Sequence, residues 1–190
     1  MTTTYQRIIP DVATYCDIAP GHAFHGPYHD SEYGFPLQDD DALFERLVLE
    51  INQAGLSWLT ILKKRDAFRQ AFDGFALEHV ARYDAQRRAK LLKNADIIRN
   101  RLKVEAAVEN AKRILALRKT HGSFARWLDA HHPREKDDWV KLFKKTFVFT
   151  GGEITGSFLL STGYLAGAHE TWCPVYERVA AARPPFMYSS

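Results

Sequence analysis

The sequence predicts an all-α fold. Apolar residues recur at helical spacing along most of the 190-residue chain, and no run of alternating apolar and polar residues is credible as a β-strand. Glycine or proline stands at the breaks between the helical runs, at Gly55, at Pro133 and at Gly151-Gly152. The chain contains neither an internal repeat nor a low-complexity tract, so we expect the helices to pack into one globular unit.

The length and composition describe a single domain over residues 1–190, or one domain with two helical lobes. A hydrophobic content of 46% with 13% aromatic residues supplies a substantial core. No apolar run of transmembrane length and no charged leader segment is present, so we expect a cytoplasmic protein without a membrane partner. The two cysteines are too far apart to suggest a disulfide framework, which agrees with a reducing compartment.

The helices are predicted as follows. Three aspartates at residues 39–41 cap and charge the start of the first strong helix, which Gly55 ends. Its apolar positions recur at helical spacing, at Leu43, Phe44, Leu47, Val48 and Ile51. Ser57 caps a short helix that contains Trp58, Ile61 and Leu62. Further helices are predicted around residues 66–72, 77–92, 97–118, 137–145 and 153–163.

A basic stretch lies between Arg82 and Lys103. It carries eight lysines or arginines against two aspartates, a net charge of +6 (8 − 2), while the whole chain carries only +3. Residues 93–96 (Lys-Asn-Ala-Asp) break the helical pattern, which indicates a helix, a tight turn and a second helix. Backbone N–H groups at the start of the second helix, with arginines beside them, would suit a DNA phosphate. The alternative is a solvated basic face on a surface helix pair.

Four residues have the spacing of metal ligands. Cys16 precedes His29 across a loop rich in glycine and proline, and His169 precedes Cys173 by four residues, so one turn can aim both at one ion. Two thiolates and two imidazoles form a closed tetrahedral shell, which predicts a structural zinc that joins the N- and C-terminal regions. The alternative is two buried free cysteines and two unrelated histidines, because the long separation matches no short zinc-finger pattern.

Glu50 is the candidate for a buried functional carboxylate. On a helical wheel it lies about 20° outside the apolar stripe of its helix, so we expect it to be half buried. A carboxylate at this edge, close to aromatic residues, could face a pocket and bind an electron-poor ring. These aromatic residues are Trp58, Tyr28, Tyr33 and Phe35. The alternative is a surface glutamate at a stripe boundary, with the aromatic residues in the core.

Three strings resemble the DNA-3-methyladenine glycosylase I family. They are Tyr-His-Asp-Ser-Glu-Tyr-Gly at residues 28–34, Leu-Glu-Ile-Asn-Gln-Ala-Gly-Leu-Ser-Trp at 49–58 and Ile-Leu-Lys-Lys-Arg at 61–65. The resemblance extends from about Cys16 to Cys173. It implies a helix-hairpin-helix glycosylase domain with a structural zinc, in which the helix-hairpin-helix spans about residues 82–118. The implied zinc ligands are Cys16, His29, His169 and Cys173.

The resemblance also implies hydrolysis of the N-glycosidic bond of 3-methyladenine in alkylated double-stranded DNA, which leaves an abasic site. Glu50 would be the catalytic and base-binding residue, between aromatic walls formed by Tyr28 and Trp58. We expect Leu56 to act as a wedge in the duplex. The implied hairpin contacts to DNA are Ala95, Ile97, Arg99 and Arg101. No catalytic lysine is implied, so we expect a monofunctional hydrolase, in the simplest case a monomer.

The chain departs from the family pattern at several positions. Asp96 stands where the hairpin usually has glycine, which raises the question of a left-handed backbone at a non-glycine residue. Tyr33 replaces a common tryptophan, and His25 lies where a pocket tyrosine can occur. Glu153 is either a second acid at the site or a helix N-terminal residue. Two other functions therefore remain open: a zinc-stabilised DNA-binding module without turnover, and a glycosylase of altered base range.

Overall fold

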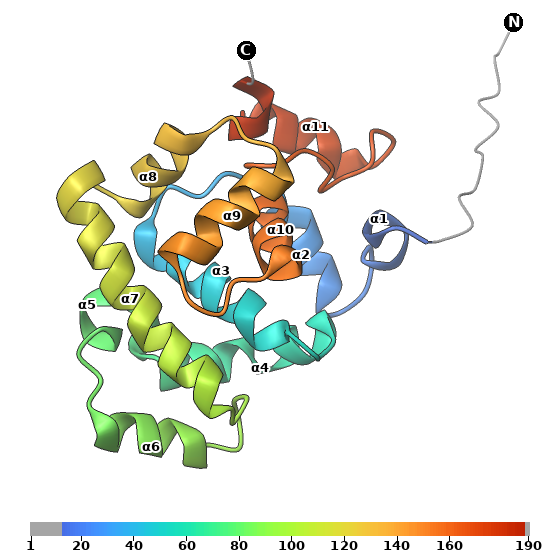
Figure 1. The fold of residues 1–190 in the computed structure, drawn as a ribbon. Coiled ribbons are helices and arrows are strands. Elements are labelled where there is room, and N and C mark those ends of the chain that lie inside the picture. Colours follow the sequence, from blue (N-terminus) through green and yellow to red (C-terminus); the bar gives the residue numbers. More distant parts are fainter. Residues whose placement is uncertain (1–12, 189–190) are drawn as a thin grey trace, which may run out of the picture.

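The computed structural model describes residues 13–188, and over them it contains helices and no strand (Figure 1). The all-α prediction is confirmed. The α-helices are α1 (Tyr15–Ile18), α2 (His25–Ser31), α3 (Asp40–Gln53), α4 (Trp58–Ala71), α5 (Leu77–Val80), α6 (Ala85–Lys93), α7 (Arg101–His121), α8 (Phe124–His131), α9 (Lys136–Thr146), α10 (Gly152–Ser161) and α11 (Pro174–Ala181). Two short 3-10 helices, η1 (Asp73–Phe75) and η2 (Pro185–Tyr188), complete the fold. None of the described helices has both the length and the apolar character needed to cross a bilayer.

Helix α3 forms the centre of the core, where α4, α7, α8 and α10 pack against it. Its start is capped as predicted, because the Asp39 side chain accepts a hydrogen bond of 2.8 Å from the amide of Ala42. The five predicted apolar positions of this helix are fully buried. The prediction that Glu50 is half buried is wrong: only 4% of it is exposed. Since α10 packs on α3, the edge of the apolar stripe is also covered.

Several predicted helix boundaries need correction. The predicted helices around Ser57 and 66–72 are one continuous helix, α4. The predicted helix 77–92 is two helices, because Asp84 caps a new start at α6 by accepting from the amide of Arg87 at 2.7 Å. Helix α7 begins later than predicted, since Asn100 caps it by accepting from the amide of Lys103. Helices α1, α2, α8 and α11 were not predicted.

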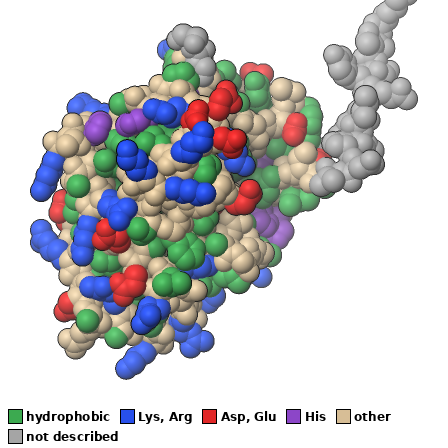
Figure 2. All heavy atoms as spheres, in the orientation of Figure 1, with side chains coloured by type: hydrophobic (Ala, Val, Ile, Leu, Met, Phe, Trp, Pro, Cys, Tyr) green, Lys and Arg blue, Asp and Glu red, His purple; other side chains and the backbone are tan. Residues whose placement is uncertain are grey.

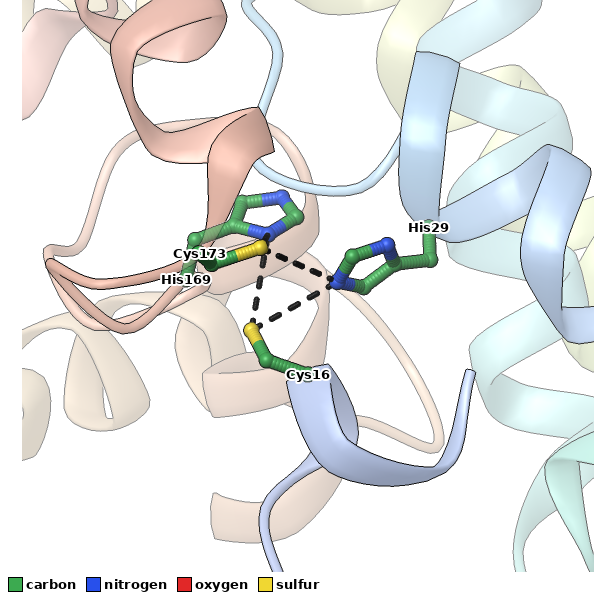
Figure 3. A group of neighbouring side chains, drawn as sticks. All are labelled: Cys16, His29, His169 and Cys173. Carbon is green, nitrogen blue, oxygen red and sulfur yellow. Dashed lines mark hydrogen bonds between the residues drawn. The ribbon is translucent and has the colours of Figure 1, made fainter. Parts of the chain in front are cut away.

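The two ends of the described chain meet beside the main core. Helices α1 and α2 lie against the segment that leads into α11 (Figures 1 and 3). A second, small hydrophobic cluster forms here from Cys16, Cys173, Val175 and Val179, and Phe35 packs against it. Phe35 was expected close to Glu50 with the other aromatic residues, and it packs in this cluster instead. The single domain with two lobes stays a prediction.

Candidate functional site

A cavity of about 250 Å³ is lined by residues of α1, α2, α3, α4 and α10. Its wall consists of four aromatic rings, one carboxylate and two polar side chains: Tyr15, Tyr28, Tyr33, Trp58, Glu50, Gln53 and Ser157. The structure thus brings together Tyr28, Glu50 and Trp58, the three predicted base-binding residues. Pockets for drug-sized ligands have volumes of about 300–1,000 Å³, so this smaller cavity suits a single base-sized ring system.

The carboxylate of Glu50 is the acidic group of this cavity. It is 4% exposed, and no described residue donates a hydrogen bond to it. Burial raises the pKa of Glu50 to about 7, against the opposing effect of the positive charge of Arg46. A buried carboxylate without a partner is costly, and a cationic ligand with hydrogen-bond donors would relieve that cost.

The aromatic side chains meet one another in tilted or edge-on arrangements around this carboxylate. The ring centroids of Tyr28 and Trp58 are 5.1 Å apart, and those of Tyr28 and Tyr33 are 5.8 Å apart. The indole Nε1 of Trp58 is buried and has no hydrogen-bond partner among the described residues. Aromatic faces attract cations, so the walls and the carboxylate favour the same kind of ligand.

Arg46 holds the Tyr28 wall from behind, a role that was not predicted. This arginine is 3% exposed and its Nη1 donates to the Tyr28 hydroxyl at 2.7 Å, while its guanidinium carbon lies 4.8 Å from the centre of the Tyr28 ring. Its Nη2 pairs with Glu32 at 3.2 Å, and Arg65 pairs with the same carboxylate. Sequence offered one signal for it, because Arg46 and Glu50 are four residues apart on one helix face.

Tyr15 is the second unpredicted aromatic residue of the cavity. Its hydroxyl lies 2.9 Å from Nδ1 of His25, so His25 stands behind a tyrosine wall that comes from another helix. Glu153 lies outside the cavity. It is in the first turn of α10, its side chain is 98% exposed, and Ser157 is the residue of that helix that lines the cavity. Of the two interpretations of Glu153, the helix N-terminal residue is therefore correct.

The four predicted metal ligands converge on one point (Figure 3). Their ligand atoms all lie within 4.8 Å of one another, and all four residues are buried. The sulfur–nitrogen separations are 3.5 Å from Cys16 to His29 and 3.7 Å for Cys16 to His169, Cys173 to His29 and Cys173 to His169. A tetrahedral ion with bonds of about 2.3 Å to sulfur and about 2.0–2.1 Å to nitrogen requires separations of about 3.5 Å. The distances therefore fit a closed tetrahedral site.

The surroundings of these ligands orient them toward the centre. Nδ1 of His29 lies 2.7 Å from Asp30, and Nε2 of His169 lies 2.8 Å from the carbonyl of Tyr33, which leaves the other nitrogen of each ring free to face the sulfurs. Burial raises the pKa of the Cys16 thiol to about 11. A bound cation would offset this effect and hold the thiolate form. The donor set and its supports fit a soft divalent metal.

Residues 94–100 connect α6 to α7 and contain the turn predicted in the basic stretch; we refer to this connection as the hairpin. Ala95, Arg99 and Arg101 are exposed, and neither arginine is paired with any described residue. The side chain of Ile97 is buried in the core, so only its backbone is left to contact a ligand. Asp96 has no left-handed backbone, and its amide donates to the Asn94 side chain at 2.9 Å. Its replacement of glycine is therefore accommodated.

Lys and Arg side chains are frequent over α6 and α7 (Figure 2). Two arginines of α6 are occupied by acidic partners, Arg87 by Asp73 at 2.8 Å and Arg88 by Glu105 at 2.6 Å. Arg99 and Arg101, together with the exposed Lys90 and Lys93, have no ion pair among the described residues and remain available to an external phosphate.

The predicted wedge residue lies at the tip of a tight turn between α3 and α4. Leu56 is 42% exposed. Its amide donates to the carbonyl of Gln53, and Gly55 has a φ of 81°, as a type II turn requires at that position. Ser57 then caps α4 by accepting from the amide of Thr60. An exposed leucine is thus presented between the two helices that carry Glu50 and Trp58.

Similarity to known proteins extends over most of the chain. A family model described as methyladenine glycosylase matches residues 21–141. The DNA-3-methyladenine glycosylase of Haemophilus influenzae is 34% identical over 182 residues, which cover 86% of this chain and 98% of that protein. A solved variant of 3-methyladenine DNA glycosylase I, in complex with 3-methyladenine, matches with a TM-score of 0.78 and 34% identity over 85% of this chain and 96% of that one. A Staphylococcus aureus structure of 3-methyladenine DNA glycosylase I matches with a TM-score of 0.77 and 35% identity over 85% of this chain and 95% of that one.

Proposed function

The chain belongs to the methyladenine glycosylase family and acts as a base-excision-repair glycosylase on alkylated DNA; we propose that the cavity around Glu50 is its base pocket. The observation that carries this proposal is the buried carboxylate without a protein donor, between aromatic walls. The substrate we assign is 3-methyladenine, which the related proteins are named for. Release of free 3-methyladenine from methylated duplex DNA, compared with DNA binding alone, tests the assignment. A protein that binds DNA without releasing the base would be the DNA-binding module considered above.

The proposed chemistry follows from the charge of the damaged base. Methylation at N3 makes the attached adenine cationic, so the bond to the sugar breaks with its electron pair moving to the base, which leaves neutral. The positive charge passes to the sugar; water then adds to the sugar carbon and releases a proton, which gives the abasic site. A cationic base is already a good leaving group, so capture of the flipped base carries much of the selectivity. Glu50 accepts hydrogen bonds from that base and balances its charge, while Tyr28 and Trp58 stack on it.

We propose that the closed Cys/His site holds one structural zinc ion. Its ligands would be Cys16, His29, His169 and Cys173. When bound, the ion would cross-link the N-terminal helices to the segment before α11. Four protein ligands leave no position for water or substrate, so no catalytic step passes through the metal.

The DNA-facing surface we propose consists of the hairpin between α6 and α7 and the turn around Leu56. Arg99 and Arg101 contact phosphates, Ala95 and Ile97 contact the backbone through their amides, and Leu56 fills the space left by the flipped nucleotide. Together with the flanking helices, the hairpin forms a helix-hairpin-helix over about residues 82–118, within one domain that acts as a cytoplasmic monomer.

Replacing Arg99 or Arg101 by alanine should weaken binding to DNA of any sequence. Each phosphate contact releases about one counterion, so the slope of log binding constant against log salt should decrease by about 1 for each arginine removed. The identity of the excised base should not change, because phosphate contacts carry no sequence information. Salt titrations of duplex binding measure this effect. Unaltered slopes in both variants would leave the basic stretch as a solvated face.

Replacing Leu56 by alanine should slow excision from duplex DNA by roughly tenfold, because an extrahelical base leaves a gap that an apolar side chain stabilises. Excision from single-stranded DNA, which has no stack to refill, should change far less. Single-turnover rates on the two substrates provide the comparison. Equal losses on both substrates would contradict a wedge role for Leu56.

A further inference from the structure

Two lysines, Lys103 of the basic stretch and Lys64 of α4, donate hydrogen bonds to backbone carbonyls of the protein. Lys103 lies in the first turn of α7 and is 5% exposed. Its ammonium group donates to the carbonyl of Asn52 at 2.9 Å and to the carbonyl of Ala54 at 2.7 Å. These carbonyls are at the C-terminal end of α3, where helix carbonyls lack partners and carry partial negative charge. Lys103 therefore caps the helix that carries Glu50.

Lys64 makes the reciprocal connection from the other side. It lies on α4, which begins directly after the Leu56 turn, and its ammonium group donates to the carbonyls of Ala95 at 3.2 Å and Asp96 at 3.0 Å. Both carbonyls belong to the hairpin between α6 and α7. Each of the two DNA-facing turns is thus held by a lysine from a helix that adjoins the other turn.

This arrangement ties three functional features to one another. The carbonyl of Ala54 lies inside the turn that presents Leu56, because the amide of Leu56 closes that turn on the carbonyl of Gln53. Lys103 is two residues after Arg101, one of the proposed phosphate contacts. A displacement of the hairpin on DNA would therefore move the wedge turn and the end of α3 with it.

We propose that Lys103 and Lys64 are positioning residues that lock the DNA-binding hairpin and the Leu56 turn into one unit, so that phosphate binding places the wedge and the base pocket over the same nucleotide. The inference rests on the proposed function of Leu56 and of the hairpin. These two lysines bind carbonyl groups of the protein itself. In contrast, the guanidinium groups of Arg99 and Arg101 have no partner in the described protein.

The test uses Lys103→Met in the full chain, which keeps the length of the side chain and removes its donors. We expect single-turnover excision from duplex DNA at saturating enzyme to fall about tenfold, while the affinity for free 3-methyladenine stays within about twofold, because the pocket walls remain. The salt slope of duplex binding should stay that of the unmodified protein. Lys112→Met is the matched control, an exposed lysine two turns or more along the same helix.

A double-mutant cycle separates positioning from a general structural role. If Lys103 acts through the wedge turn, Leu56→Ala should slow duplex excision much less in the Lys103→Met background than in the unmodified protein. Additive losses would overturn the proposal, and so would a salt slope lowered by about 1, since that would make Lys103 a phosphate contact. If Lys103→Met no longer binds free 3-methyladenine, its pocket is disrupted, and the same double-mutant cycle with Lys64→Met tests the proposal instead. Failure of the unmodified protein to release 3-methyladenine would instead contradict the proposed function.

Discussion

Removal of the metal is expected to destabilise the protein by several kcal/mol, the largest stability effect that we predict. Purified protein should contain about one zinc ion per chain by elemental analysis. Either a strong chelator or Cys173→Ala should lower the free energy of unfolding, because the ion joins α1 and α2 to the segment before α11 and only a small hydrophobic cluster would remain there. Thermal unfolding with and without chelator measures the difference.

A matched control comes from a histidine outside the site. His79 is exposed on α5, so His79→Ala should leave both the zinc content and the response to chelator unchanged. The prediction fails if the unmodified protein contains no metal. It also fails if Cys173→Ala and the unmodified protein respond alike to the chelator, since the four residues would then be a buried Cys/His cluster without a ligand.

The core helices were predictable from sequence because each has a local signal. Helix α3 combines an acidic cap at Asp39 with apolar positions at helical spacing, and the structure retains both. Two of the boundaries that failed depend on single caps inside basic, helix-favouring segments. Asp84 and Asn100 each restart a helix there, and neither stands out from the pattern around it.

The helices near the chain ends could not be predicted from periodicity. Helix α2 spans seven residues and buries Tyr28, which lines the cavity, and His29, which belongs to the Cys/His cluster. Its apolar pattern is therefore not that of an amphipathic surface helix. Cys16 and His169 are 153 residues apart, and no local rule indicates that they meet. Their pairing was suggested by ligand spacing and by resemblance to a family.

The burial of Glu50 shows what local periodicity misses at the site itself. A helical wheel places a side chain relative to its own helix, but α10 determines how much of the stripe edge is covered, and α10 is about 100 residues later in the chain. The same long-range packing supplies Ser157 to the cavity, and α1 supplies Tyr15. Residue types at the centre of the site were therefore predictable, whereas its enclosure was not.

Replacing Glu50 by glutamine should reduce excision of 3-methyladenine about 10²-fold or more, while duplex binding stays largely intact. The change keeps the size of the side chain, removes its charge and turns one acceptor into a donor. The damaged base is cationic and loses its electrostatic partner, whereas the hairpin arginines that bind phosphate are unaffected. The unmodified protein should also bind free 3-methyladenine more tightly than adenine. Because the free base is neutral, Glu50→Gln should weaken this binding less than it weakens excision.

The pH dependence should report the same group. Because burial raises the pKa of Glu50 to about 7, the carboxyl is protonated below that pH in the free enzyme and loses the charge that attracts the base. The excision efficiency kcat/KM of the unmodified protein should therefore fall as the pH decreases through about 7, and Glu50→Gln should lack this inflection. A buried, unpaired carboxylate costs stability above the pKa it has when unfolded, so the variant should be more stable at pH 8, by on the order of 1–3 kcal/mol.

Glu153→Gln is the matched control, since it makes the same chemical change at an exposed carboxylate on α10 outside the cavity. It should leave the excision rate and the pH inflection near 7 unchanged, and it should not raise the stability at pH 8. If Glu50→Gln retained full activity and the unmodified protein bound adenine and 3-methyladenine equally, the base pocket would lie elsewhere. The comparison of excision with free-base binding distinguishes a pocket that selects the base by its positive charge from one that selects it by shape, because the base is cationic only while it is attached to the sugar.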